Sequence, residues 1–170
     1  MNAVLSTTTH AYARTHTAIF VSDKLRNFLK LLVRYYGLDP QGVLDAWSEW
    51  TDRAVRAWLE SGHLQLIIIE FYWPGGTKAE ARWEFPIRYD GNGADDMWID
   101  RTFLEGALEK AKAPPPGCSY RIVLRTLPGA PRVYGVGDTT LRSTAHLIAR
   151  ESGTVIATPD VMASARYYRT

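Results

Sequence analysis

Cysteine is scarce in this sequence, and the spacings of a metal site are missing. Cys118 is the single cysteine among 170 residues, which excludes an internal disulfide and a zinc site built from several cysteines. The four histidines include no i, i+4 pair, and His10 and His16 lie six residues apart. The sequence therefore predicts neither a metal site nor a cofactor. Its low cysteine content is typical of a reducing compartment.

Excess charge of one sign and long apolar runs are also missing. Lysine plus arginine number 20 against 18 for aspartate plus glutamate, and this net charge of +2 is too small to indicate a dedicated binder of nucleic acid or membrane surfaces. The most apolar run, residues 63–73, is about half the roughly 20 residues of a membrane-spanning helix. The Thr-rich N-terminus lacks the basic and apolar parts of a signal peptide. We expect a cytoplasmic protein with no membrane partner.

Catalytic motifs are missing as well. The Gly-Val-Gly-Asp stretch at residues 135–138 has neither the third glycine nor the lysine and hydroxyl pair of nucleotide-binding loops. A thiol enzyme that uses Cys118 with His63 or His146 is one hypothesis, but a lone cysteine is more often a small buried hydrophobic residue. The sequence predicts a protein that is not an enzyme.

The composition that is present suits one folded domain. Hydrophobic residues make up 46% of the chain and aromatic residues 12%, which excludes global disorder. At about 150 residues per domain, the chain corresponds to a single unit over residues 1–170.

Apolar residues at spacings of three and four predict a first amphipathic helix that ends at Gly37. Thr15 or Thr17 is the expected cap at its start, and residues 1–14 precede it as an extended leader. The outer face of this helix carries four cations against Asp23 alone. These cations are Lys24, Arg26, Lys30 and Arg34.

A second long helix is predicted over residues 39–61, because an Asp-Pro pair opens it and Gly62 follows it. It carries three tryptophans, Trp47, Trp50 and Trp58. Helical spacing places such tryptophans in the core more often than on a binding platform.

Three strands and a short helix are predicted after this. Residues 63–73 are apolar on both alternating faces, which favours a central strand, and residues 79–88 alternate as its hairpin partner with Arg82 and Glu84 outward. Pro86 indicates that the partner strand lies near an edge or bulges. Thr102 with Glu105 fits a capping box for the short helix, and residues 119–127 form the third strand.

The pattern changes after Leu127. Residues 128–170 contain short mixed stretches between glycines and prolines, and none has a strong single period. Such a segment fits either a part of the chain that packs in more than one way or ordinary hairpins, and the residues alone do not decide between them.

The order of these elements, together with several short stretches, resembles the HORMA domain. The stretches are Thr15-His16, Arg34-Tyr35-Tyr36-Gly37, Asp39-Pro40 and the sequence Ala-Trp-Leu-Glu-Ser-Gly-His-Leu at residues 57–64. They are similar to bacterial HORMA-domain proteins of cyclic-oligonucleotide anti-phage (CBASS) operons, and the similarity covers essentially the whole chain.

The resemblance implies an α+β fold with three helices packed on an antiparallel sheet. Residues 15–127 would form the core, residues 1–14 a leader and residues 128–170 a safety belt with open and closed arrangements. In the family, the closed belt wraps a closure-motif peptide. The resemblance further implies a cyclic-oligonucleotide synthase (CD-NTase) as the activated partner, an AAA+ ATPase that reopens the belt from the leader, and a second HORMA protein as a further partner.

A guest peptide in such a protein is expected to add a strand beside residues 119–127. The expected contacts on that strand are Tyr120, Ile122 and Leu124. The belt contacts expected from hydrophobicity and position are Val133, Tyr134, Val136, Tyr167 and Tyr168. The alternative hypothesis is a nucleic-acid-binding adaptor that uses the basic face of the first helix, and it predicts an affinity that falls steeply with salt.

Overall fold

The computed structural model describes residues 13–90 and 97–170. Most of the expected leader therefore lies outside the described residues. The helical elements are α1 (Thr15–Tyr35), α2 (Gln41–Ala46), the π-helical turn η1 (Trp47–Thr51), α3 (Asp52–Glu60) and α4 (Arg101–Lys110). The strands are β1 (Leu64–Tyr72), β2 (Ala81–Arg88), β3 (Trp98–Ile99), β4 (Ser119–Thr126), β5 (Ile148–Ala157) and β6 (Met162–Arg169).

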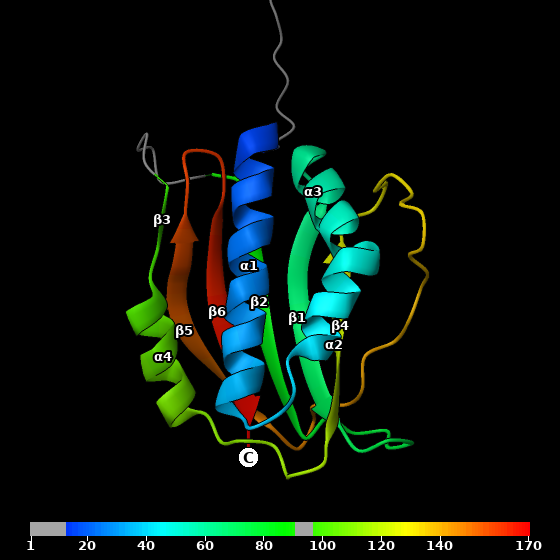
Figure 1. Ribbon diagram of the computed structural model, residues 1–170, viewed down its shortest axis with the longest axis vertical. Helices are drawn as coiled ribbons and strands as arrows, with labels where there is room; N and C mark the ends of the chain where they lie inside the picture. Colours follow the sequence, from blue (N-terminus) through cyan, green and yellow to red (C-terminus); the bar gives the residue numbers. More distant parts are fainter. Residues whose placement is uncertain (1–12, 91–96) are drawn as a thin grey trace, which may run out of the picture.

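The six strands form one antiparallel sheet in the order β3-β5-β6-β2-β1-β4. The helices cover one face of this sheet, with α1 over the middle, the α2–α3 unit over β1 and β4, and α4 beside β5 (Figure 1). The main core lies between these two layers. The predicted α+β class, with three helical units on an antiparallel sheet, is confirmed, and so is the central position of β1 between β2 and β4.

The start of α1 differs from the prediction. The N-cap is Arg14, and its side chain makes no capping bond, so neither Thr15 nor Thr17 caps the helix. The hydroxyl of Thr17 instead donates to Asp160, which lies in the turn between β5 and β6. Asp160, about 140 positions later in the chain, therefore accepts the hydrogen bonds of the Thr17 hydroxyl and the Arg14 backbone N–H, which have no partner within the helix.

The second predicted helix is one continuous unit, but it contains the π-helical turn η1. The extra residue of a π-turn rotates the following side chains relative to a regular helix. Trp47 is 4% exposed and Trp58 is 7% exposed, whereas Trp50 is only half-buried. Gly42 brings this unit close to β4, because a Cβ there would lie 2.7 Å from the Tyr120 hydroxyl oxygen.

β2 corrects two predictions. It lies between β1 and β6, so Pro86 is in an interior strand and not near an edge. Phe85 and Pro86 do not pair with β6, but the register with β6 is the same on both sides of them, so the strand has no bulge there. Arg82 and Glu84 are buried rather than outward. The C-terminal segment covers their face of the sheet, and the two side chains form ion pairs with each other and with neighbouring charges.

The cap of α4 is Asp100 rather than Thr102. The Asp100 carboxylate accepts a hydrogen bond from the Phe103 backbone N–H at 2.8 Å, and the helix begins at Arg101. Aspartate is as good an N-cap as threonine, so the capping-box pattern alone places the start of the helix two residues late.

The C-terminal segment (residues 128–170) wraps around the sheet. After β4 the chain runs outside that strand, crosses behind the sheet and returns as the β5–β6 hairpin, which pairs with β2 on the far side (Figure 1). The two ends of the segment therefore lie at opposite edges of the core strands β2, β1 and β4.

Candidate functional site

The outer edge of β4 is the main feature of the candidate site. β4 ends the strand order and pairs only with β1, so within the described residues no strand pairs with its outer edge. A free edge offers a row of backbone N–H and C=O groups to an added strand.

A cavity of about 760 Å³ separates this edge from the loop that follows it. The β4 side is formed by Ile122, Val123, Leu124 and Thr126. The helical layer contributes Trp50 and Trp58, and the opposite wall is formed by residues 130–139. We call this cavity the β4 groove. It is wide enough for an extended chain with several side chains.

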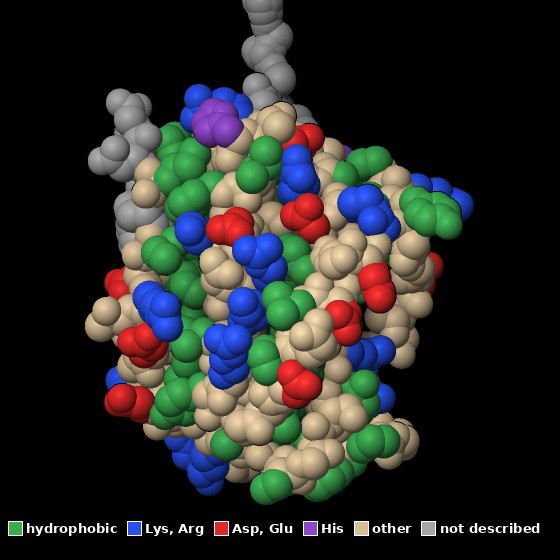
Figure 2. Space-filling model, in the orientation of Figure 1, with side chains coloured by type: hydrophobic (Ala, Val, Ile, Leu, Met, Phe, Trp, Pro, Cys, Tyr) green, Lys and Arg blue, Asp and Glu red, His purple; other side chains and the backbone are tan. Residues whose placement is uncertain are grey.

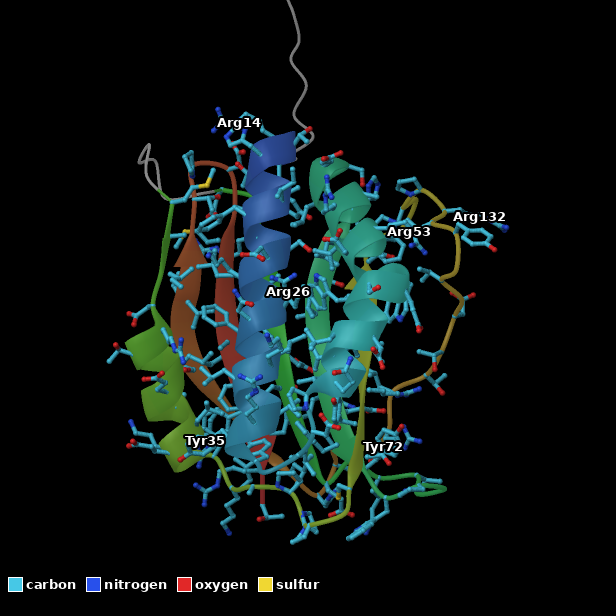
Figure 3. All side chains as sticks on the ribbon, viewed as in Figure 1. Arg14, Arg26, Tyr35, Arg53, Tyr72 and Arg132 are labelled. Atoms are coloured by element: carbon cyan, nitrogen blue, oxygen red, sulfur yellow. The ribbon has the colours of Figure 1, made fainter. Side chains whose placement is uncertain are left out.

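The outer wall of the β4 groove is held to the helical layer. The Trp58 indole N–H donates to the Pro131 carbonyl oxygen at 2.7 Å, and the Arg53 guanidinium donates to the Tyr134 carbonyl oxygen at 3.3 Å. Arg53 points toward the loop that carries Arg132 (Figure 3). Val133 also packs against the core. The wall is therefore fixed to the helical layer at Pro131 and Tyr134.

A second hollow of about 550 Å³ continues the edge of β4 toward its start. Trp50 and Ile122 line both hollows, so the two form one path along the strand. Tyr120 lies here, and its hydroxyl donates to the Asp39 carbonyl oxygen at 2.6 Å. Burial, opposed by hydrogen bonds at the start of α2, raises the pKa of Tyr120, so the phenol stays protonated at neutral pH.

The structure brings together six of the eight side chains that the sequence suggested for a peptide site. Ile122, Leu124, Val133, Tyr134 and Val136 line the β4 groove, and the sixth, Tyr120, lines its continuation. The Tyr134 side chain is 90% exposed.

Tyr167 and Tyr168 lie elsewhere. Both are on β6, and β2 and β1 separate that strand from β4. Tyr167 packs on Trp83, with ring centroids 5.1 Å apart. The sequence analysis did not identify Trp50 and Trp58 as groove residues. Helical spacing assigned them to the core, and that spacing does not reveal the π-helical turn η1, which rotates the side chains that follow it.

The turn of the β5–β6 hairpin is anchored at the start of α1. The Asp160 carboxylate accepts hydrogen bonds from the Thr17 hydroxyl at 2.7 Å and from the Arg14 backbone N–H at 3.1 Å, and it pairs with the Arg14 guanidinium at 3.0 Å. Burial raises the pKa of Asp160, but the hydrogen bonds and the Arg14 charge outweigh it and hold the pKa below its ordinary value of 3.8.

We expect Asp160→Asn to lower the free energy of unfolding by about 1–2 kcal/mol at pH 7. Because the folded pKa lies below the unfolded one, the ionised carboxylate stabilises the fold above about pH 4, and this contribution is lost as the pH falls through the folded pKa. Urea unfolding of both proteins between pH 2 and 7 measures the difference. Asp90→Asn, which removes the exposed Arg88 pair, is the control and should change the curve much less, because solvent screens that pair. A wild-type advantage that stays constant with pH would contradict the assignment.

Cys118 lacks the surroundings of a reactive thiol. Its side chain is buried, and burial together with the nearby Glu80 charge raises the pKa of the thiol, which disfavours the nucleophilic thiolate. Cys118 precedes β4, whereas His63 precedes β1, and the antiparallel register pairs Ser119 with Tyr72. Cys118 and His63 therefore lie at opposite ends of the paired strands.

The basic face of α1 is partly neutralised. Lys and Arg side chains gather along α1 in Figure 2, with Asp and Glu side chains among them. Asp23 forms ion pairs with both Lys24 and Arg26. In the part of the chain that the structure describes, no group of three or more metal-ligating side chains occurs, and no helix is long and apolar enough to cross a membrane.

The fold, a helix-covered antiparallel sheet with a C-terminal segment that runs around the outside of an edge strand, is the HORMA fold. The model of the family "Bacterial HORMA domain 2" matches residues 6–170. The chain belongs to this family. No curated protein shows significant sequence similarity to it.

Solved structures share this fold. A chain of the mitotic checkpoint complex has a TM-score of 0.67 at 11% identity, over 91% of this chain and 99% of that one. C. elegans HTP-2 bound to the HIM-3 closure motif has a TM-score of 0.67 at 12% identity, over 94% and 93%. A chain of the E. coli MS115-1 HORMA:CdnC:Trip13 complex has a TM-score of 0.62 at 12% identity, over 100% and 98%. At these identities the likeness shows the fold.

Proposed function

We propose that this protein is a peptide-binding signalling switch of bacterial anti-phage defence that acts by binding and not by catalysis. The observation that carries the proposal is the free outer edge of β4 facing the loop of residues 130–139 across the β4 groove. An extended closure-motif peptide would pair its backbone with β4, as β-strand addition requires, and the loop would enclose it from outside.

The groove suggests the pattern of the guest. Side chains of an added strand alternate between the two faces of the sheet. Those on the helical side would meet Trp50, Ile122, Leu124 and Val136. We therefore infer a guest segment with an apolar residue at every second position. The β5–β6 hairpin, docked on β2, would make this the closed arrangement, with residues 15–127 as the core and residues 128–170 as the safety belt.

The partners follow from the same proposal. The closed, peptide-bound protein would bind and activate a cyclic-oligonucleotide synthase in the cytoplasm, and an AAA+ ATPase would reopen the belt by gripping residues 1–14. The E. coli structure, in which a HORMA protein is in complex with CdnC and Trip13, supports this assignment of partners. The closure motif bound to C. elegans HTP-2 supports the peptide as the ligand. A second HORMA protein is a further candidate partner.

A peptide-display screen with the full chain tests the proposal. Captured peptides should share an extended pattern with alternating apolar residues. Addition of a captured peptide should slow amide hydrogen exchange in β4 and in residues 130–139, while the exposed face of α1 stays unchanged. Failure to capture any peptide, or protection confined to α1, would overturn it. Binding of duplex DNA that weakens steeply with salt would support the adaptor hypothesis instead.

A further inference from the structure

A buried carboxylate lies in the middle of the sheet, on the face opposite the helices. Glu70 of β1 is 0% exposed, and its neighbours Ile69 and Phe71 point to the helix-side core. Because strand side chains alternate, Glu70 points to the other face. A buried carboxylate is unfavourable unless charged and hydrogen-bonding partners surround it. The partners of Glu70 therefore indicate what keeps it buried.

Three arginines surround this carboxylate. Arg121 of β4 donates from Nε to Oε1 at 2.7 Å, and Arg82 of β2 lies 3.4 Å from Oε2. Arg142 belongs to the segment that crosses behind the sheet, and it donates twice: its Nη1 lies 2.8 Å from Oε1 and its backbone N–H donates to Oε2 at 3.1 Å. Burial alone would raise the pKa of Glu70, but these partners outweigh it and lower the pKa.

Arg142 is fixed on several sides at once. Its guanidinium carbon lies 3.5 Å from the centre of the Tyr72 ring, and its Nε donates to the Gly76 carbonyl oxygen at 2.9 Å. Its own carbonyl oxygen accepts a hydrogen bond from Arg82 at 2.6 Å. Tyr72 marks the lower end of β1 in Figure 3. The guanidinium thus meets a carboxylate, a ring and a carbonyl in one geometry, which a lysine cannot reproduce.

The residues beside Arg142 follow it onto the sheet. Ser143 exchanges backbone hydrogen bonds with Thr77 and Ala79, at 3.1 and 2.9 Å. Leu141 packs on a small apolar cluster that is separate from the main core. That cluster consists of Leu66, Ile68 and Val123.

Arg121 connects this contact to the β4 groove. It lies on β4 between Tyr120 and Ile122, and besides Glu70 it donates to the Thr139 hydroxyl at 2.9 Å and to the Thr140 carbonyl oxygen. Thr139 also lines the β4 groove. The groove wall and the crossing segment are therefore joined to β1 and β4 through one carboxylate.

We propose that Glu70 is the positioning residue of the peptide site, which fixes the C-terminal segment behind the sheet through Arg142 and so holds the outer wall of the β4 groove in place. We call Glu70, Arg121 and Arg142 the Glu70 clasp. The clasp forms only when residues 139–143 lie against the sheet, because Arg142 supplies two of its hydrogen bonds. The proposal rests on the proposed peptide-binding function, yet part of its test needs no peptide.

The first test measures amide exchange of the peptide-free full chain by NMR. Arg142→Gln and Glu70→Gln should each increase the exchange rate of the backbone amides of residues 142 and 143 by about 10-fold or more. The exchange rates in Arg142→Lys should lie between those of these variants and those of wild type. The matched control is Glu84→Gln, since Glu84 is a buried carboxylate paired with Arg82 and Arg166, but its β6 partner strand is already paired with β2 by the sheet. If the Ser143 amide exchanges in Arg142→Gln at the wild-type rate, the clasp does not hold residues 139–143 against the sheet. This conclusion stands even if Glu70→Gln fails to fold.

The second test uses a peptide captured in the display screen. Arg142→Gln should raise the peptide dissociation rate about 10-fold or more, and Glu84→Gln should change it little. An unchanged dissociation rate would overturn the role of the clasp in holding the groove. If no peptide is captured at all, the proposed function fails, whereas the exchange experiment still decides whether the clasp holds residues 139–143.

Discussion

Replacement of Trp83 by alanine should lower the free energy of unfolding by about 3–5 kcal/mol, the range for removing a buried aromatic side chain. Trp83 is 1% exposed and is one of the largest fully buried side chains. It lies at the centre of the sheet in β2, and it contacts both β6 and the end of α1. Its loss would leave a cavity that this packed interior cannot fill.

The contacts of Trp83 explain the size of the effect. The ring lies 6.5 Å from that of Phe85 and 5.1 Å from that of Tyr167, measured between centroids. Its indole N–H donates to the Tyr36 hydroxyl at 2.8 Å, just beyond α1. Burial raises the pKa of Tyr36 to about 12, although the bond from Trp83 opposes this, so the phenol remains protonated over the usual pH range. Trp83 thus joins the helical layer to the C-terminal hairpin.

Urea unfolding monitored by circular dichroism measures the change. The free energy of unfolding of Trp83→Phe should lie between those of Trp83→Ala and wild type, because phenylalanine keeps the ring packing but leaves the Tyr36 hydroxyl without its donor. Trp73→Ala is the control, since Trp73 is 42% exposed, and it should cost less than about 1 kcal/mol. Equal losses for Trp83→Ala and Trp73→Ala would show that Trp83 does not join the two layers.

Substitution of Leu124 by glutamate should weaken binding of a captured peptide by about 100-fold, or roughly 2.7 kcal/mol. Leu124 lies on the free edge strand and lines the β4 groove. A guest strand would bury the new carboxylate beside Trp50 and Val136 and so remove it from water. Burial of an unpaired charge costs several kcal/mol unless the group is neutralised.

Leu127→Glu is the matched control for this prediction. Leu127 follows β4 directly, is 41% exposed, and does not line the β4 groove, so the same change in charge should alter affinity less than about threefold. Isothermal titration calorimetry gives both values, and unfolding curves establish that each variant is folded. Equal affinities for the two variants would place the guest away from this part of β4.

The elements that the sequence predicts well are those with a local signal. The apolar period of α1, the uninterrupted apolar run of β1 and the alternation in β4 each follow from residues within one element. Six of the eight expected site residues lie along one groove, because they belong to β4 or to the loop directly after it.

The remaining errors concern contacts between distant parts of the chain. Tyr167 and Tyr168 were expected in the site, but hydrophobicity does not say which edge of a sheet a strand joins, and β6 joins β2. Arg82 and Glu84 were expected outward, because alternation of polar residues does not reveal contacts with distant residues. Arg82 donates to the Arg142 carbonyl oxygen, 60 residues later, and Glu84 pairs with Arg166. The cap of α1 at Asp160 escapes local reasoning for the same reason.

The Asp160 anchor also has a mechanical consequence. Among the described residues, the proposed ATPase pulling from the N-terminal side would load first the Ala13 hydrogen bond to Leu59 and then, one residue later, the Arg14 contacts with Asp160. Tension applied at that end would therefore reach the tip of the β5–β6 hairpin before α1 unwinds by a single turn. Force on the N-terminus would therefore act directly on the C-terminal β5–β6 hairpin, and the rest of the domain would not have to unfold first.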